Sequence, residues 1–334
     1  MGNQIRNPKS FNTVRFSNRN ERLKKQQKQR VLILAMLAVI ALLILSLVVF
    51  SVCAVVSGIA RTANDAKDPD QNPTPSGGIV YREMTELASK VRTGELILVN
   101  KNYIYNFPNP STQGFINLKT ADRATINGRN TYQIYSKAST LSIQPEAFAA
   151  FETMMRDYYM QTEDGSVTVR EVYRSGDTQE SMNTSVKAGY SDHHTGYLIN
   201  LTNYDETSLP ADHWVYQNCH KYGFVVRYPS DKSAQTGVDN YREAIRYVGV
   251  AHATYMKTNN LCMEEYLNVL KSFTLNAPLT VTCDNGNRYQ IYYVSVNASD
   301  TVVQFAVPSN YGYEISGDNV GGLIVTVNLN DPIA

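Results

Sequence analysis

The pattern of apolar and polar residues first separates the start of the chain from the rest. Residues 31–60 are uncharged and predominantly apolar. A bilayer core needs about 20 such residues, whereas the apolar region of a cleaved signal peptide is only about 7–15 residues long. Residues 31–60 are therefore predicted to form a transmembrane signal anchor. Residues 61–80, rich in Pro, Gly, Asn and Asp, are predicted to be a flexible linker.

Residues 81–274 combine strand-like and helical patterns. Apolar residues recur at helical spacing over 145–160, a stretch that begins with Pro145, and Pro is favoured in the first turn of a helix. Alternation of apolar and polar residues predicts a strand over 94–108. Further strands are predicted near 166–175, 197–201, 224–229 and 241–248, and further helices over 210–223, 249–257 and 263–272. The expected class is α+β, with a small, mostly antiparallel sheet flanked by helices.

Residues 275–334 have a different pattern. Strand-like alternation continues to the end of this segment, with turn signals at 284–286 and 316–318 and no helical stretch. These features predict a small all-β module of four or five strands.

Charge is distributed unevenly, although the net charge of the chain is only +1. A value near zero argues against nucleic acid as a general partner. Residues 1–30 carry nine Lys or Arg and one acid, Glu21, and are predicted to be a disordered cytoplasmic tail, because basic residues before an anchor remain inside. The chain after residue 61 would then lie outside a bacterial cell membrane that it crosses once. The tail could alternatively bind anionic lipid or a cytoplasmic partner.

The cysteines do not form a disulfide framework. Cys53 lies in the predicted anchor, which leaves Cys219, Cys262 and Cys283 outside the membrane. A Cys219–Cys262 disulfide is one alternative, with Cys283 unpaired. Such sparse use of cysteine fits the surface of a Gram-positive bacterium better than a small secreted scaffold.

Several ordered motifs carry a family resemblance. The segments are VYRSGDTQ at 172–179, GYSDHHTGYLINL at 189–201, NCHKYGFVVRYP at 218–229 and TGVDNYREAIRYVG at 236–249. Together they resemble the VanY-type D-alanyl-D-alanine carboxypeptidases, which are zinc peptidases. The resemblance covers roughly residues 90–272, and several motifs at compatible spacing are more specific than one alone.

The resemblance implies a zinc site that this sequence has largely lost. It places His193 at one ligand position, Asn200 where the family has a ligand aspartate, Ala244 where it has a ligand histidine, and Tyr241 where it has a general-base glutamate. Catalytic zinc needs three protein ligands, yet an amide oxygen is neutral and alanine has no donor atom. A phenol, with an ordinary pKa near ~10, cannot replace a carboxylate base. Zinc is therefore expected to be lost or weakly bound, and the hydrolytic centre to be inactive.

The alternative is an active zinc D,D-carboxypeptidase with a rebuilt metal site that removes the terminal D-Ala of the peptidoglycan pentapeptide. If the stretch around His193 is extended, the side chains of Asp192 and His194 face away from it, and both are expected to be polar loop residues. Glu243 would face away from position 244 for the same reason. The other histidines are expected to be structural or to lie on half-exposed helix faces: His213, His220 and His252.

Part of the predicted binding site is retained. By resemblance, Arg174 binds the C-terminal carboxylate of the D-Ala-D-Ala stem peptide, a role that suits the fixed fork of donors of a guanidinium. Ser175, Gln179 and Ser191 are retained with it. The leading hypothesis is a membrane-anchored pseudoenzyme that binds peptidoglycan stem peptide or a cell-envelope protein. In the alternatives Arg174 forms only a structural ion pair, or the protein is a scaffold that binds no peptide.

Overall fold

The computed structural model describes residues 78–107, 112, 114–138, 141–182, 184–239 and 241–333. Residues 75–334 belong to one compact unit. The predicted tail, the predicted anchor at 31–60 and nearly all of the predicted linker lie outside the described residues. Within the described ranges, no helix combines the length and apolar character needed to cross a membrane.

A mixed sheet forms the centre of the unit. Its strand order is β5-β7-β8-β10-β9, and only the β5–β7 pair is parallel. The strand bounds are β5 Gln133–Ile134, β7 Thr168–Glu171, β8 Leu198–Thr202, β9 Phe224–Val226 and β10 Ala244–Tyr247. The predicted mostly antiparallel sheet is thereby confirmed.

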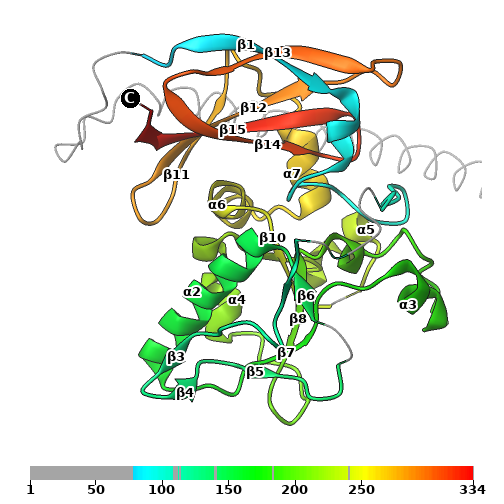
Figure 1. Ribbon diagram of the computed structural model, residues 1–334, viewed down its shortest axis with the longest axis vertical. Helices are drawn as coiled ribbons and strands as arrows, with labels where there is room; N and C mark the ends of the chain where they lie inside the picture. The colour runs from blue at the N-terminus through cyan, green and yellow to red at the C-terminus, as the bar shows by residue number, and fades with distance from the viewer. Residues whose placement is uncertain are drawn as a thin grey trace, which may run out of the picture. The chain divides into compact units, whose positions relative to one another are not determined.

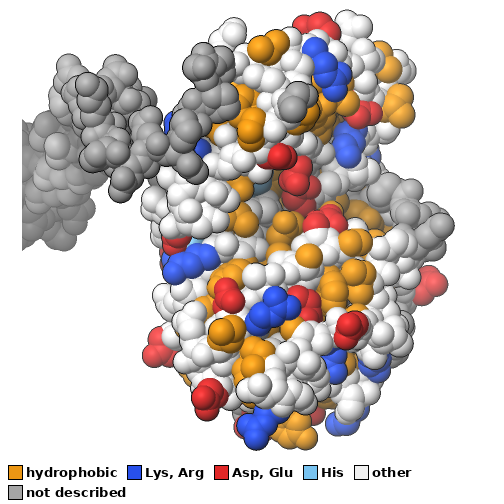
Figure 2. Space-filling model, turned by 60° about the vertical axis from the view of Figure 1, so that its left-hand side comes forward, with side chains coloured by type: hydrophobic (Ala, Val, Ile, Leu, Met, Phe, Trp, Pro, Cys, Tyr) orange, Lys and Arg blue, Asp and Glu red, His pale blue; other side chains and the backbone are white. Residues whose placement is uncertain are grey.

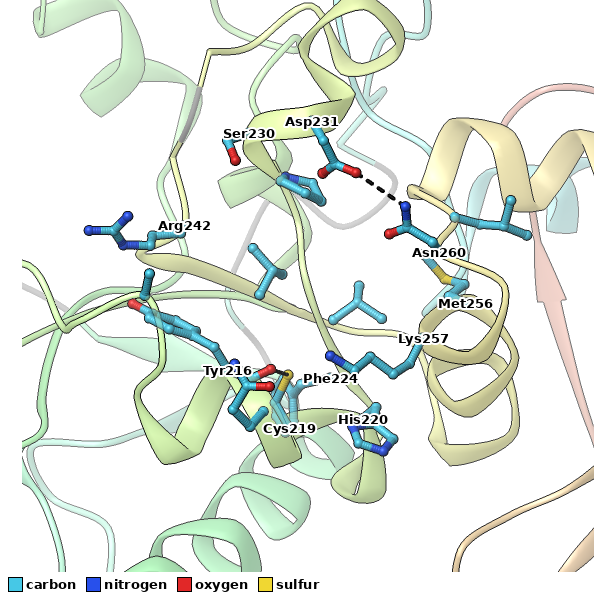
Figure 3. Close-up of a pocket in the computed structure, with 16 residues that line it drawn as sticks. Tyr216, Cys219, His220, Phe224, Ser230, Asp231, Arg242, Met256, Lys257 and Asn260 are labelled. Carbon is cyan, nitrogen blue, oxygen red and sulfur yellow. Dashed lines mark hydrogen bonds between the residues drawn. The ribbon is translucent and has the colours of Figure 1, made fainter.

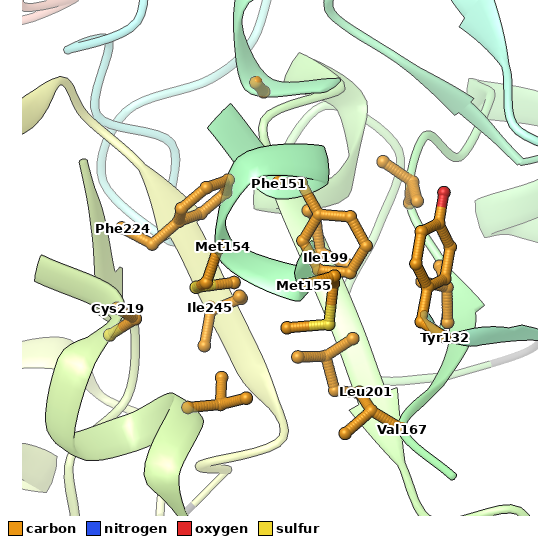
Figure 4. Packing of buried hydrophobic residues seen from close by; sticks show 14 of the residues in the cluster. Tyr132, Phe151, Met154, Met155, Val167, Ile199, Leu201, Cys219, Phe224 and Ile245 are labelled. Atoms are coloured by element: carbon orange, nitrogen blue, oxygen red, sulfur yellow. The ribbon is translucent and has the colours of Figure 1, made fainter. Parts of the chain in front are cut away.

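Helix α2 covers one face of this sheet (Figure 1). It spans Pro145–Thr162, with Pro145 in its first turn, as its helical spacing predicted. Figure 4 shows Phe151 and Met155 of the helix facing Ile199 and Leu201 of β8, and all four side chains are fully buried. Burying side chains of this size is worth about 1.5–3 kcal/mol each, so this contact is a main part of the core.

The other helices are shorter. The α-helices are α3 Gly176–Ser181, α4 Trp214–Asn218, α5 Ser233–Thr236, α6 Val250–Thr258 and α7 Met263–Leu270, and the 3₁₀ turns are Ala88–Arg92, Asp192–Thr195, Cys219–Tyr222 and Ser230–Lys232. Two small ribbons complete this part: β2 Ile116–Asn117 with β6 Ser142–Ile143, and β3 Thr125–Ile126 with β4 Arg129–Asn130. The predicted helices over 249–257 and 263–272 are confirmed, whereas the one over 210–223 is divided between α4 and a 3₁₀ turn.

The strand predicted over 94–108 is wrong for the residues that the structure describes, 94–107. An isolated bridge from Asn100 to Tyr103 is the extent of its regular pairing. The four consecutive residues 96–99 are all buried, so the segment has no exposed face. Side chains from elsewhere bind its carbonyl groups instead of a partner strand: Asn319 donates to Leu98 and Arg246 donates to Ile97.

The C-terminal strands form a four-stranded sheet in the order β11-β12-β15-β14 and a separate β1–β13 ribbon. The bounds are β1 Tyr81–Leu87, β11 Leu279–Thr282, β12 Arg288–Ser295, β13 Val302–Pro308, β14 Tyr311–Gly317 and β15 Gly322–Pro332. Five strands after residue 275 match the predicted number. β1, however, lies alongside β13 over its whole length (Figure 1), so a strand of the predicted 81–274 domain pairs with a strand of the predicted 275–334 module.

Helices α6 and α7 pack against this C-terminal sheet. His252 of α6 is fully enclosed, with Nδ1 2.6 Å from the Tyr266 hydroxyl and Nε2 2.8 Å from the Thr326 hydroxyl. Burial lowers the pKa of His252 to about 3, so the imidazole is neutral. The expectation that His252 is structural is confirmed.

The three described cysteines, Cys219, Cys262 and Cys283, are buried free thiols. The alternative of a Cys219–Cys262 disulfide is therefore wrong. Burial raises the pKa of the Cys262 thiol to about 11, which keeps it in the unreactive protonated form.

Candidate functional site

The positions that the resemblance assigned to the metal site converge at one end of the central sheet. Asn200 of β8 lies opposite Glu171 of β7 on one side and opposite Ala244 of β10 on the other. Directly opposite residues of antiparallel strands place their side chains on the same face. The 3₁₀ turn Asp192–Thr195 brings His193 beside this row, with Nε2 3.6 Å from Glu171 Oε2.

His193 has a defined orientation. Its Nδ1 lies 2.6 Å from the Val172 carbonyl oxygen and must therefore donate to it, which leaves Nε2 as an acceptor. Nε2 is buried and has no hydrogen-bond partner among the described residues. Burial lowers the pKa of His193, so the neutral ring places this nitrogen, unpaired among the described residues, 3.6 Å from Glu171 Oε2.

Asn200 and Tyr241 bind each other. The Asn200 amide donates to the Tyr241 hydroxyl, while the other amide atom, Oδ1, is buried without a partner in the described part of the chain. Tyr241 lies just before β10 and stacks on Tyr228 at 6.0 Å between ring centroids. Burial raises the pKa of Tyr241, so this hydroxyl stays protonated at neutral pH and cannot act as a general base.

These residues do not fit the zinc set of the family. His193 offers one imidazole nitrogen, Asn200 offers a neutral oxygen, and Ala244 offers nothing. The nearest carboxylate, Glu171, is engaged by Arg174. In the described ranges, no group of three or more His, Cys, Asp or Glu side chains is arranged to hold a metal ion.

Arg174 forms a two-pronged ion pair with Glu171. Its Nε donates to Glu171 Oε1 at 2.8 Å, and its Nη2 donates to Oε2. A third donor, Nη1, binds Gln179 Oε1 at 2.7 Å. Burial disfavours the Glu171 charge, but the hydrogen bonds from Arg174 and the charges of Arg174 and Arg170 hold the pKa of Glu171 below its ordinary value. The structure thus contains the ion pair that was the alternative role of Arg174.

A cavity of about 470 Å³ opens beside this pair. Its walls are mostly polar and consist of Thr112, Tyr135, Ala138, Ser142, Arg170, Glu171, Tyr173, Ser175, Thr178 and Asn200. Of the predicted binding residues, Ser175 lines the cavity and also accepts the Thr178 N–H at the start of α3. Gln179 and Ser191 are buried and do not line it. Gln179 accepts a hydrogen bond from Arg174 Nη1, and the Gln179 amide donates to the Val186 carbonyl oxygen at 2.8 Å.

Sequence reasoning missed Glu171 and the aromatic wall. Glu171 lies three residues before Arg174 within the strand predicted over 166–175, and an acid so close to an arginine was the available signal. Tyr135 directly follows β5, far in sequence from the motifs. The Arg170 guanidinium lies 4.4 Å from the centroid of the Tyr135 ring. Nothing in the local sequence pointed to Tyr135.

Asp192 and His194 are not the polar loop residues that were expected. The stretch is a 3₁₀ turn rather than extended, and both side chains are buried. His194 donates from Nδ1 to the Arg174 carbonyl oxygen at 2.6 Å, and its Nε2 accepts the Gly189 N–H at 3.0 Å. Asp192 accepts from the buried guanidiniums of Arg227 and Arg246. Both residues therefore hold the motif in place instead of extending the site.

The remaining candidates for a rebuilt site are engaged elsewhere. Glu243 accepts from the Ser208 hydroxyl. His213 caps α4 through Nδ1, which accepts the Val215 N–H at 3.2 Å. His220 lies 3.4 Å from Asp284 and lines a second cavity of about 320 Å³ around β9 that shares no residue with the first. Figure 3 shows Lys257 and Tyr216 around the same cavity. None of these side chains approaches His193.

Glu95, Glu146 and Glu314 form an acidic cluster. Burial, together with the negative charges of Glu314 and Glu146, raises the pKa of Glu95 to about 7. Tyr197 donates to Glu146. On the face displayed in Figure 2, acidic side chains gather beside a hollow, while basic and acidic groups are interspersed over the rest.

Comparisons with known proteins agree with the motifs. A family model described as VanY: D-alanyl-D-alanine carboxypeptidase matches residues 133–250. A D-alanyl-D-alanine carboxypeptidase of Enterococcus faecium is 32% identical over 259 residues, which cover 74% of this chain and 79% of the relative. The vancomycin resistance D,D-dipeptidase VanXYg, solved with a D-Ala-D-Ala phosphinate analog, has a TM-score of 0.61 at 22% identity and covers 75% of this chain and 99% of its own.

A further solved protein carries the metal. It is a mutant of the D,D-pentapeptidase VanY from a VanB-type resistance cassette in complex with Zn(II), with a TM-score of 0.38 at 24% identity, covering 52% of this chain and 99% of its own. The VanXYg likeness shows a shared α+β fold. The identity to the Enterococcus faecium enzyme and the coverage of both chains show the family as well. The chain belongs to the VanY family of D-alanyl-D-alanine carboxypeptidases.

Proposed function

We propose that this protein is a non-hydrolytic member of the VanY family that binds the peptidoglycan stem peptide in the cavity beside Arg174. The observation that carries the proposal is the contact between Asn200 and Tyr241. These residues stand at a ligand position and at the general-base position, and they bind each other. Ala244 adds no donor atom. The cavity next to them stays open and is lined by polar groups.

The chemistry of the cavity suits binding without cleavage. Hydrolysis of an amide needs an activated water and a group to accept its proton. Glu171 is committed to Arg174, and the Tyr241 hydroxyl remains protonated. The Ser175 and Thr178 hydroxyls can pair with peptide N–H and C=O groups, and the rings of Tyr135 and Tyr173 can cover small D-Ala methyl groups.

We also propose that the protein is anchored in a bacterial cell membrane by residues 31–60, with its N-terminus in the cytoplasm and residues after 61 outside. The length and apolar character of 31–60 and the nine basic residues before it support this orientation. Protease added to intact cells should remove an epitope placed at the C-terminus and leave one at the N-terminus. The opposite pattern would refute the orientation.

The proposed function can be tested on the full chain in detergent. Zinc content, D-Ala release from a stem pentapeptide and the heat of peptide binding are measured together. We expect no stoichiometric zinc, no release of D-Ala, and saturable binding that Thr178→Val weakens. Ser181→Ala on the same helix serves as the control, because Ser181 does not line the cavity.

Other results would favour the other functions. Stoichiometric zinc with D-Ala release that Arg174→Ala weakens would establish an active carboxypeptidase. If the pentapeptide is neither cut nor bound, in acid or carboxamide form, the protein is a scaffold or binds a cell-envelope protein, and the proposal is wrong.

A further inference from the structure

Glu171 presents its carboxylate to Arg174 as a peptide terminus would. A guanidinium binds a carboxylate most specifically through two parallel N–H···O bonds, and Arg174 makes that arrangement with Glu171. We propose that Glu171 is an internal carboxylate that fills the Arg174 fork, so that the cavity selects stem peptides whose C-terminus is a carboxamide over those that end in a free carboxylate. This inference rests on the proposed peptide-binding function.

The guanidinium has little left to offer a ligand. Nε and Nη2 bind Glu171, and Nη1 binds Gln179. The Arg174 side chain is 10% exposed, whereas that of Glu171 is 29% exposed. A peptide entering the cavity therefore meets the carboxylate of the pair before it meets the guanidinium.

The pair is also held by the backbone at both ends. Glu171 is fixed opposite Asn200 at the end of β7, next to a register shift. The Arg174 N–H donates to the His193 carbonyl oxygen at 3.2 Å, and the Arg174 carbonyl accepts from His194. The backbone of Arg174 is thus tied to the turn that contains His193, and the backbone of Glu171 is tied to β8. The ion pair is therefore part of the preformed site.

Charge balance argues against a carboxylate ligand. Arg174 and Glu171 neutralise each other in their two-pronged ion pair. Arg170, the basic residue in the cavity wall, pairs with Glu206 at 2.9 Å. An incoming carboxylate would have to displace Glu171 and leave that charge partly buried beside a like charge, which is unfavourable.

A carboxamide terminus avoids this cost. Its NH₂ group can donate to the Glu171 oxygens and its carbonyl can accept from the Ser175 or Thr178 hydroxyls, with no net charge entering the site. Glu171 then keeps its bonds to Arg174. The ligand class that this subsite takes is thus a D-Ala-containing peptide with a neutral, amide-type end.

The test compares two probes, the stem pentapeptide with a free C-terminal carboxylate and the same peptide with a C-terminal carboxamide. Binding to the full chain in detergent is measured by calorimetry. We expect the wild type to bind the carboxamide more tightly by about 10- to 100-fold, the range that corresponds to a hydrogen bond to a charged group. Glu171→Gln frees the positive charge of Arg174 and should reverse the preference.

Glu206→Gln is the matched control. It removes one negative charge next to Arg170 at the same cavity, while Glu171 and Arg174 stay paired. We expect it to retain the wild-type preference. A reversal in this variant would mean that net charge alone sets the selectivity, and the inference would be wrong.

The remaining outcomes separate the two proposals. If the wild type binds the free acid as tightly as the carboxamide, or more tightly, the inference is overturned while the proposed function stands. This comparison needs no variant, so it decides even if Glu171→Gln does not fold. If neither peptide binds to the wild type or to folded Glu171→Gln, the proposed function fails and the inference fails with it.

Discussion

Replacing Asp192 with Asn should be among the most damaging single changes to this fold. The carboxylate is fully buried between two fully buried guanidiniums. Its Oδ2 accepts from Arg227 Nε at 2.6 Å, and its Oδ1 accepts from Arg246 Nε at 3.1 Å. The substituted amide would keep the shape of the side chain but remove the charge that balances both cations.

The expected cost follows from what each arginine retains. Arg227 keeps Glu264, with contacts of 3.0 and 2.8 Å. Arg246 keeps the carbonyl groups of Tyr247 and Ile97 and the ring of Tyr197, 4.8 Å from its guanidinium carbon, with no second carboxylate in ion-pair range among the described residues. Breaking a buried pair costs about 3–5 kcal/mol. Because one of the two cations keeps a partner, we expect a loss of about 3 kcal/mol, a large part of the roughly 5–15 kcal/mol that stabilises a typical protein.

The assay is urea unfolding of the full chain in detergent at pH 7, followed by near-UV circular dichroism. Asp284→Asn is the control, because that carboxylate is 51% exposed and lies 3.4 Å from His220 and 3.8 Å from Lys221. Exposed pairs contribute at most about 1 kcal/mol. If Asp192→Asn costs less than about 1 kcal/mol, or no more than the control, the argument from buried charge is refuted.

The pH dependence of this loss has a definite sign. Burial alone would raise the pKa of Asp192, but Arg246 and Arg227 hold it below the ordinary value of 3.8. The contribution of Asp192 to stability is therefore full above pH 3.8 and is lost as the pH falls from there through the folded-state pKa. The difference between wild type and Asp192→Asn should narrow in that acidic range.

Three further predictions concern the metal site, the acidic cluster and a turn. Asn200→Asp combined with Ala244→His should restore stoichiometric zinc, measured by mass spectrometry, because the two positions lie opposite each other and His193 Nε2 is unpaired among the described residues. A double variant that binds no zinc would contradict this prediction. The pKa of Glu95 is raised from 4.5 to about 7, so the stability of the fold decreases as the pH rises through that range. Glu95→Gln should therefore be more stable than the wild type by about 1–2 kcal/mol at pH 8 but not at pH 4. Gly94→Ala should lower the free energy of unfolding by about 2 kcal/mol in a thermal unfolding experiment, because φ is +110° and the new Cβ would lie 2.3 Å from a serine oxygen. Gly286→Ala, where φ is +82° and the space around the new Cβ is open, should cost less. Equal costs for the two variants would show that the close contact at Gly94 is not destabilising.

Local patterns were sufficient for the elements that carry the motifs. The period of apolar residues predicted α2 because one stripe of that helix is buried against β8. The alternation over YLINL predicted β8 because Ile199 and Leu201 face the core. The order of the motifs also identified the family and led to the prediction that Asn200, Tyr241 and Ala244 occupy its metal and base positions. The strand register places Ala244 opposite Asn200, and a hydrogen bond joins Asn200 to Tyr241. Such features depend on residues close in sequence or on motifs with fixed spacing.

Other features depended on partners that lie far along the chain. Residues 94–107 alternate like a strand, but Asn319 and Arg246 bind their carbonyl groups, and no local pattern reveals a donor more than a hundred residues away. β1 likewise pairs with β13, more than two hundred residues later. The same applies to Asp192, which resembles an ordinary polar residue in the sequence until Arg227 and Arg246 meet it in the core.

The sequence by itself determined the family and the main helix and strands of the central sheet, and it led to the prediction that groups needed for zinc hydrolysis are missing. Only the tertiary structure decided that Arg174 is paired with Glu171 and that Asn200 binds Tyr241. The physical reason is that residue types and spacing specify which groups are present. The pairing of these groups depends on their distances in the folded chain. Burial makes each pairing energetically important, because a buried polar or charged group without a partner is destabilising.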